Sequence, residues 1–459
     1  MGRMSDLEEL LEGVSKAAAA LGSATSSGKL ITIRAHDDVD GICSGTIAFL
    51  TVRALGGSAH LSFSGHLYED ELAKLLSGRP EFLMLCDMGS DLVPVLRKSR
   101  VPYLVLDHHP SEERDDQLVN PWAFGINGAR EISASGCAYL VSRALDGDST
   151  ALALIAICGA YGDMQSIEGP NERILTEAES TGLVKRRKEI RLIGRVDRPI
   201  EYSIRYSTSP FIRDLAGDPD AVREFLKEVG LATDPTLTIS QLDADKERML
   251  ISGIVERMVR ANASTFEAEK LFGSTLRLPR AAVPTIEDLV DYLESCAALK
   301  RYSVGFSLLV GEPGALAEAE GCRLCYKEKI FEGVRLFKRA VRMPNIEYLV
   351  LEGWTEYSGK LSTIYANAGF ARQDAPVFAL NAEGQHIKVS ARANPQLVKK
   401  GLDLGRALSR VAERFGGVGG GHDVAAGARV PRGCQEEFLR ALDKEIGMQL
   451  AGREEAVDG

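Results

Sequence analysis

Six aspartate and histidine side chains are candidate metal ligands, because each lies where an apolar run of the sequence ends. They are His36, Asp38, Asp40, Asp87, His108 and Asp163. In an extended segment, residues two apart share a face, so the first three can converge on one point. Crowded carboxylates repel one another unless cations neutralise them, and mixed aspartate and histidine ligation suits manganese better than calcium. The pattern predicts a two-metal centre.

Each of these residues also has a purely structural interpretation. A single aspartate at the end of a strand is usually a helix cap or a turn residue, and His108 with His109 could form a solvated turn. Four such sites on successive elements favour a functional role over a structural one. Two histidines directly after an apolar strand and Asp107 are also hard to explain by packing.

The elements that must position these side chains alternate between strand-like and helix-like segments. Short apolar runs predict strands at 30–35, 60–63, 82–87 and 101–107. Apolar spacing predicts helices at 7–21, 42–55, 69–76, 92–99, 133–145 and 151–161. This alternation is typical of an α/β fold with a doubly wound parallel sheet, in which ligands bind at the carboxyl ends of the strands.

The rest of the chain predicts two further parts. The basic run 185–191 reads as helical, and the pattern is again mostly helical from about residue 214 to residue 299. Strand-like segments follow at 302–310, 347–354, 376–380 and 386–392, and a helix at 402–415 leads into a glycine-rich loop. We therefore expect three domains: a catalytic domain (1–213), a helical insert that could bind a partner (214–300), and a smaller α/β domain (301–459).

Composition excludes several classes of protein. The chain has 459 residues, of which 45% are hydrophobic and 26% charged, as in ordinary globular proteins. Its net charge of −10 provides no general basic field for coating nucleic acid, so local basic groups or bound metal must hold any polyanion. The longest apolar stretch falls short of the ~20 residues of a membrane span, and the acidic N-terminus does not look like a secretory signal. We expect a reduced, cytoplasmic protein with no membrane partner.

Six motifs together resemble a known group of enzymes. HDDVDG, CDMG, LDHHP and GDMQ, in that order, look like the four motifs of the DHH phosphoesterase superfamily. The later KVSARAN and GGVGGGHDVAAG resemble the signature of the C-terminal domain associated with it, which binds the substrate. The resemblance covers about residues 28–170 and 345–430. It is strongest to archaeal RecJ-like exonucleases, a branch that includes the nuclease associated with the GINS replication complex.

The resemblance implies a metal-binding role for five residues of the first domain. Asp38 and Asp40 would bind metal, and Asp87 would bridge both ions. His108 and Asp163 would complete the second metal site.

The resemblance also implies roles for three further residues near these ligands. His109 would face the scissile phosphate, and Asp107 would orient a histidine rather than bind metal itself. His36 precedes Asp38 by two residues, whereas some members of the superfamily place the ligand histidine four residues before the first aspartate. We include His36 among the expected ligands.

The resemblance further assigns a phosphate-binding site to the C-terminal domain. The expected substrate-binding residues are Ser390, Arg392, Gly419, Gly420, Gly421 and His422. Glycines let backbone N–H groups approach a phosphate, and an arginine can grip it with two hydrogen bonds. The alternatives are a flexible turn for the glycines and a surface salt bridge for Arg392.

The function implied is a manganese-dependent phosphodiesterase, with magnesium as the alternative ion. It would degrade single-stranded DNA or RNA from one end, in DNA replication or repair, and the insert could bind a GINS-type replication protein. A second hypothesis is a hydrolase of short oligonucleotides, cyclic dinucleotides or pyrophosphate. A third is an inactive subunit of the replicative helicase assembly, against which the retained acids argue.

Two other features of the sequence leave their roles open. The run from Lys185 to Lys188 could be a solvated helix face or could guide a nucleic-acid strand. Cys322 and Cys325 have zinc-like spacing but lack a second ligand pair, so we expect ordinary thiols.

Overall fold

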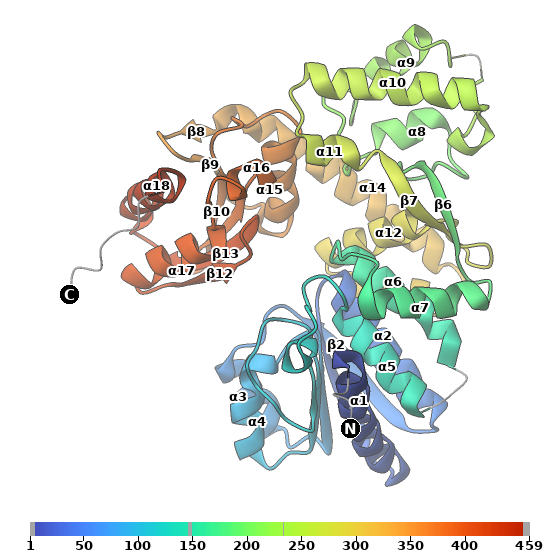
Figure 1. Ribbon diagram of the computed structural model, residues 1–459, viewed down its shortest axis with the longest axis vertical. Helices are drawn as coiled ribbons and strands as arrows, with labels where there is room; N and C mark the ends of the chain where they lie inside the picture. The colour runs from blue at the N-terminus through green and yellow to red at the C-terminus, as the bar shows by residue number, and fades with distance from the viewer. Residues whose placement is uncertain (1–4, 146–148, 233, 453–459) are drawn as a thin grey trace. The chain divides into compact units, whose positions relative to one another are not determined.

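The computed structural model describes residues 5–145, 149–232 and 234–452 (Figure 1). These residues form two compact units, the first made of residues up to 187 with 274–323, and the second of 188–273 with the rest of the chain. No helix in the described ranges is both long and apolar enough to cross a membrane. Each unit is described by itself.

The first unit contains the parallel sheet that the sequence predicts, and its strand order is β2-β1-β3-β4-β5. The strands are β1 (Leu30–His36), β2 (Ser58–Ser64), β3 (Phe82–Cys86), β4 (Tyr103–Leu106) and β5 (Leu118–Val119). β3 and β4 are buried along their whole length, as expected for strands covered on both faces. The chain adds β2 on one side of β1 and β3 on the other, so the strand order reverses between β1 and β3. Ligands bind at this point in sheets of this kind.

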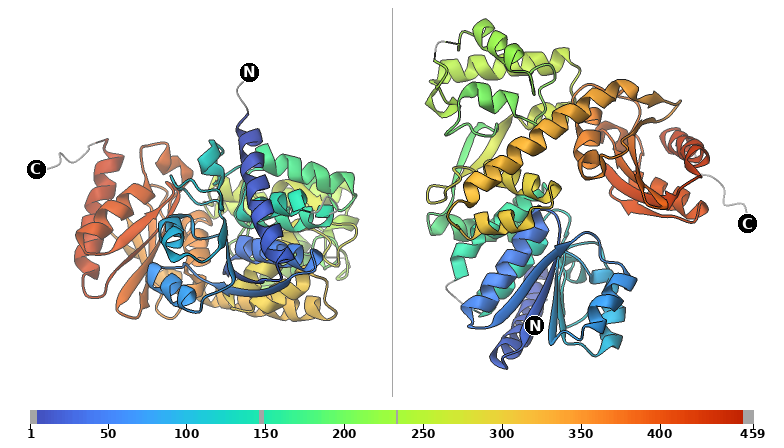
Figure 2. Two further views of the ribbon diagram at one scale, coloured as in Figure 1. Left: turned by 90° about the horizontal axis from the view of Figure 1, so that it is seen from below. Right: turned by 180° about the vertical axis from the view of Figure 1, so that it is seen from behind.

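Helices cover both faces of this sheet (Figures 1 and 2). One face packs against α3 (Glu69–Ser77) and α4 (Val93–Ser99). The other face carries the larger core, which includes residues of α1 (Asp6–Ser26), α2 (Val39–Ala54), α5 (Ala134–Leu145), α6 (Ala153–Gly162), α7 (Gly169–Ser180) and α12 (Ile286–Ala298). The doubly wound α/β class predicted from the sequence is therefore confirmed.

The second unit combines two cores. Its helical part contains α8 (Ile200–Arg205), α9 (Pro219–Glu228), α10 (Ala244–Arg260) and α11 (Thr265–Glu269) around an apolar core. It is tied to the C-terminal part, because the Ser264 N–H donates to the Asn367 carbonyl over 2.8 Å and the Ser264 hydroxyl donates to the Asn367 side-chain oxygen over 3.1 Å.

The C-terminal part of this unit is built on a six-stranded sheet with the order β12-β13-β11-β10-β9-β8. The strands are β8 (Val341–Arg342), β9 (Glu347–Val350), β10 (Val377–Glu383), β11 (His386–Arg392), β12 (Val418–Gly421) and β13 (Ala425–Pro431). The helices are α15 (Ser358–Asn367), α16 (Pro395–Val398), α17 (Leu404–Arg414) and α18 (Gln435–Leu450). The apolar sides of α17 and α18 pack on one face of the sheet, and α15 packs against β10 and β11.

Two expected elements have the wrong secondary structure. The basic run 185–191 is predicted as a helix but forms strand β6 (Lys185–Ile190), which pairs with β7 (Phe272–Arg277). The segment 302–310 is predicted as a strand but forms helix α13 (Tyr302–Leu309), which is followed by α14 (Ala315–Val334). In both segments, contacts with the rest of the fold override the local preference of the sequence for a helix or a strand.

The grouping of the chain also differs from the boundaries drawn at residues 213 and 300. Helix α12 buries Ile286, Leu289 and Leu293 in the core of the first unit, so residues 274–300 pack with the parallel sheet rather than with the helical insert.

Candidate metal centre

Three groups of ligating side chains lie at the carboxyl edge of the parallel sheet. In each group the ligand atoms lie within 4.8 Å of one another. The groups are Asp87 with His108 and His109, His36 with Asp38 and Asp87, and Asp40 with His108 and Asp163. The structure therefore brings together all six expected metal ligands, and His109 with them.

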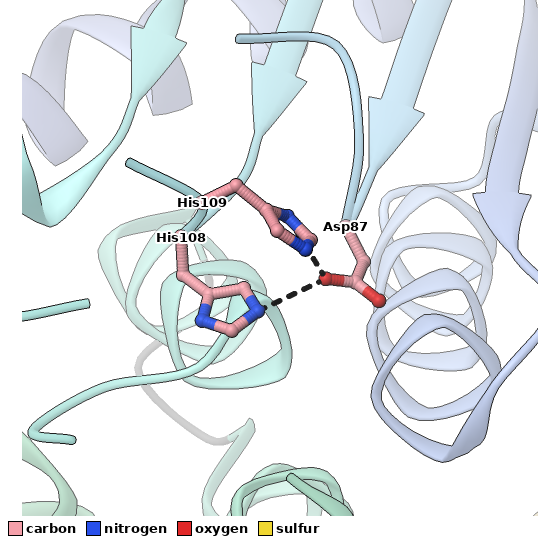
Figure 3. A group of neighbouring side chains, drawn as sticks. All are labelled: Asp87, His108 and His109. Carbon is pink, nitrogen blue, oxygen red and sulfur yellow. Dashed lines mark ion pairs between the residues drawn. The ribbon is translucent and has the colours of Figure 1, made fainter. Parts of the chain in front are cut away.

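Asp87 and His108 connect these groups, as Figure 3 shows for one of them. Asp87 Oδ1 lies 3.2 Å from His108 Nε2, whereas Asp87 Oδ2 lies 3.4 Å from His36 Nδ1. On its other side, His108 Nε2 is 3.1 Å from Asp163 Oδ2. The two oxygens of one carboxylate thus face two different histidines, as a carboxylate shared by two ions would require.

The backbone of Asp87 is held in the left-handed region, with φ of 61°. Its N–H donates to the Leu106 carbonyl over 2.7 Å, at the end of β4. Non-glycine residues seldom adopt this conformation, although aspartate and asparagine tolerate it better than most. The turn directs the buried carboxylate of Asp87, which is 1% exposed, into the cluster.

Asp40 is fully buried, unlike the partly exposed His36, Asp38 and Asp163. Its carboxylate accepts hydrogen bonds from the backbone N–H groups of Ala134 (2.7 Å) and Ser135 (3.1 Å), at the start of α5. A helix N-terminus stabilises a negative charge. Burial and the neighbouring charge of Asp87 nevertheless raise the pKa of Asp40 to about 6.

Hydrogen bonds fix the orientation of the two adjacent histidines. His108 Nδ1 is 2.7 Å from the Gly128 carbonyl, so Nδ1 carries a proton, and Nε2, which faces Asp87 and Asp163, is the nitrogen that could bind a cation. His109 Nδ1 is 2.8 Å from Asp107 Oδ1, and the side chain of His109 is 55% exposed. Asp107 thus contacts a histidine, as the resemblance implies, and belongs to none of the three ligand groups.

Charges in the site are strongly coupled. Burial disfavours the charged form of His108, but Asp87 and Asp163 outweigh it and hold the pKa of His108 well above its ordinary value. Burial, followed by the charge of Asp40, raises the pKa of Asp163. For Asp107, the hydrogen bond from His109 overcomes burial and keeps its pKa below the usual range.

The donor set fits divalent ions that accept both oxygen and nitrogen ligands. Asp87 Oδ1 and His36 Nδ1 are buried, and neither has a hydrogen-bond partner of acceptable geometry among the described residues. Buried polar atoms without partners are costly, and bound cations would give each of these two atoms a partner. Manganese or magnesium would be held by the oxygens of the four aspartates and by His36 and His108.

Several residues that support the site carry no role in the sequence interpretation. The Gln165 amide lies 3.3 Å from His108 Nδ1 and donates to the Gly128 carbonyl over 2.9 Å. The buried Asn120 amide donates to the His109 carbonyl over 2.9 Å and to the Ser90 hydroxyl over 2.7 Å. Gln165 lies inside the GDMQ motif, whereas no local pattern points to Asn120.

Three glycines allow neighbouring atoms of the site to pack closely against the backbone. A Cβ at Gly41 would lie 2.2 Å from the His36 carbonyl oxygen, and one at Gly128 would lie 2.2 Å from the His108 carbonyl oxygen. A Cβ at Gly159 would lie 2.2 Å from Asp40 Oδ1. Such distances are far below van der Waals contact, so these positions require glycine.

Gly159→Ala is therefore expected to push the Asp40 carboxylate from its place and weaken metal binding. The added methyl would also lie 2.1 Å from Ser135 Oγ, so the helix contact must widen, at a cost of about 1–3 kcal/mol. Calorimetric titration with Mn²⁺ checks the affinity. Gly321→Ala, at a helical position where a Cβ meets nothing, is the control and should bind as the wild type does.

The residues expected to bind substrate share one sheet of the second unit. Gly420 pairs with Gly427 on β13, which in turn pairs with Ser390 on β11, so these three lie in one row on the face opposite the α17 core. Gly419 and Gly421 flank that row, and His422 follows it, exposed and with its N–H bonded to the Ala425 carbonyl.

Arg392 lies at the end of the same strand as Ser390. Its Nε donates to the Thr363 hydroxyl over 3.0 Å, and burial lowers its pKa. Within the described ranges it forms no ion pair with a carboxylate, so the surface salt bridge considered as its alternative role is absent. Cys322 is buried and Cys325 exposed, and neither belongs to a group of ligating side chains in the described part of the chain.

Comparison with known proteins finds a domain family and a related sequence. Residues 345–448 match the DHHA1 domain family. An uncharacterized protein of Methanocaldococcus jannaschii is 32% identical over 436 residues, which cover 92% of this chain and 94% of that protein.

Two solved structures share the fold. RecJ from Thermus thermophilus, in complex with Mn²⁺, has a TM-score of 0.57 and 17% identity over 95% of this chain and 55% of its own. This chain thus spans about half the length of that RecJ. CDC45 from Entamoeba histolytica has a TM-score of 0.62 and 10% identity over 95% of this chain and 99% of its own. The chain belongs to one family with the Methanocaldococcus protein, and its residues 345–448 form a domain of the DHHA1 family.

Proposed function

We propose that this protein is a manganese-dependent phosphodiesterase that degrades single-stranded DNA or RNA from one end. The observation that carries the proposal is the Asp87 carboxylate, whose two oxygens face His108 and His36 on opposite sides. The RecJ structure that shares the fold was solved with Mn²⁺, which supports the same choice of ion here. Magnesium is the alternative.

The chain's own residues would position and polarise the phosphate. Bound divalent ions would supply an activated water and neutralise the charge that develops on the phosphate. The hydrogen bond to Asp107 raises the pKa of His109 and directs its exposed Nε2 away from that carboxylate. A protonated His109 can then donate to an oxygen of the scissile phosphate, as the resemblance implies.

The C-terminal sheet would hold the terminal nucleotide of the strand. Arg392 offers guanidinium N–H groups without a carboxylate partner among the described residues, and His422 adds an exposed ring. Gly420 supports a binding role over a packing role, because a Cβ there would meet nothing within 4 Å. A bare backbone at an open position suits close approach of a phosphate.

Gly420→Ala is expected to raise KM for a nucleic-acid strand while leaving the thermal stability and metal content unchanged. The added methyl has room in the folded protein but would block a phosphate that approaches the backbone. Steady-state kinetics and a melting curve check this. A variant with unchanged KM would contradict a phosphate site at this strand, and Gly321→Ala again serves as the neutral substitution.

Digestion of end-labelled single strands tests the proposal itself. The decisive comparison is kcat/KM for a dinucleotide, a cyclic dinucleotide, pyrophosphate and a strand of about twenty nucleotides, with Mn²⁺ present. A preference for the strand, weakened by added salt, supports the exonuclease. If the strand is the poorest substrate, the small-substrate hydrolase replaces it.

The same proposal includes a role in DNA replication or repair, in the cytoplasm. It also includes binding of a GINS-type protein by the helical insert. The complete set of acids disfavours a subunit that only binds. A pull-down with the full chain against replication proteins of the source organism tests the partner.

A further inference from the structure

Asp37 stands next to the metal ligands but belongs to none of their groups. In a regularly extended segment its side chain would point away from those of His36 and Asp38. In the structure it turns back toward the imidazole, with Asp37 Oδ1 3.8 Å from His36 Nε2. Its other oxygen, Oδ2, accepts a hydrogen bond of 3.2 Å from the Tyr302 hydroxyl.

The imidazole of His36 therefore has two different sides. Its Nδ1 faces the cluster, 2.8 Å from Asp38 Oδ2 and 3.4 Å from Asp87 Oδ2. A neutral ring that gives the Nδ1 lone pair to a cation must carry its proton on Nε2. Histidines that bind metal commonly donate this second N–H to a carboxylate, which fixes the ring and makes it a better ligand. Asp37 is the carboxylate on that side, at an ion-pair distance from Nε2 that is longer than a direct hydrogen bond.

Tyr302 is held firmly enough to orient Asp37. It begins helix α13, which packs on α2, and a Cβ at Gly305 would lie 3.5 Å from Ile42. The Tyr302 ring also contacts Phe63, with ring centroids 5.5 Å apart. The hydroxyl thus reaches Asp37 from a packed helix, although the two residues are 265 positions apart in the chain.

We propose that Tyr302 is a positioning residue for the first metal site: through Asp37 it holds His36 in the orientation that binds the ion shared with Asp38 and Asp87. The proposal rests on the metal centre of the proposed function and extends it. The second group, formed by Asp40, His108 and Asp163, includes none of Tyr302, Asp37 and His36, so we expect substitutions at Tyr302 or Asp37 to leave it unchanged.

Calorimetric titration of the metal-free, full-length protein with Mn²⁺ tests this, because it requires no substrate. Tyr302→Phe should weaken one of two binding steps by about 10–100-fold and leave the other unchanged. Asp37→Ala should have the same effect, and the double variant should be no worse than Asp37→Ala alone. Asp37→Asn keeps an acceptor oxygen and should restore part of the affinity.

Tyr103→Phe is the matched control, because it removes a similar hydrogen bond, of 3.0 Å, to Asp115 in the same unit. Tyr103→Phe should bind both ions normally. If Tyr302→Phe binds both ions as the wild type does, or weakens both steps equally, the positioning role is wrong while the metal centre stands. If the wild type binds no Mn²⁺, the proposed function fails first, and the inference fails with it.

Discussion

Asp87→Asn is expected to lower the rate of phosphodiester hydrolysis by about a thousand-fold or more, because the side chain faces both histidines across the site. Loss of several kcal/mol of charge stabilisation corresponds to a factor of about 10³ in rate. An amide offers one oxygen, and its nitrogen cannot bind a cation. The substitution therefore removes the shared ligand while it keeps the shape of the side chain.

Asparagine is a better test here than alanine. Residue 87 has a φ of 61°, and asparagine tolerates this left-handed conformation whereas alanine is strained in it. In the presence of a chelator, Asp87→Asn should melt at or above the temperature of the wild type, because it removes one of several crowded negative charges. Added Mn²⁺ should stabilise the wild type and not the variant.

The matched control is Asp91→Asn, in the turn that follows Asp87. Asp91 is exposed and belongs to no ligand group, so its substitution should leave hydrolysis and metal binding unchanged. Hydrolysis by Asp87→Asn at the wild-type rate would contradict the proposal that two ions share this carboxylate.

Chelation of divalent ions is expected to abolish hydrolysis and to lower the melting temperature. Without cations, the carboxylates remain buried together, which raises the pKa of Asp40 to about 6 and that of Asp163 above its ordinary range. An ion present at 100 times its dissociation constant should add about 2.7 kcal/mol of stability per site. Differential scanning calorimetry with and without EDTA measures this change.

Restoring the ions distinguishes a binding centre from a general salt effect. Mn²⁺ should restore both activity and stability, whereas Ca²⁺ should do so poorly, because it prefers all-oxygen coordination and two histidines are among the ligands. Full activity in EDTA would exclude metal-dependent hydrolysis. Equal rescue by Ca²⁺ would argue against histidine ligation.

The sequence by itself determined the α/β class, the parallel sheet and which residues meet in the candidate metal centre. It could do so because buried parallel strands appear as short apolar runs, and because their carboxyl ends meet at one edge. His36, Asp87 and His108 follow such runs directly. Residues that a local pattern places at strand ends are therefore brought together by any fold of this class.

Only the tertiary structure decided the residues that hold those ligands in place. Gly159 must be glycine because Asp40 packs against it from another helix, and Asn120 supports the His109 carbonyl from beyond the fifth strand. Tyr302 lies in a segment that the sequence predicts as a strand, but the structure forms a helix there that packs on α2 and reaches Asp37. Contacts between residues far apart in the chain leave no local period in the sequence, so these positions follow only from the packed fold.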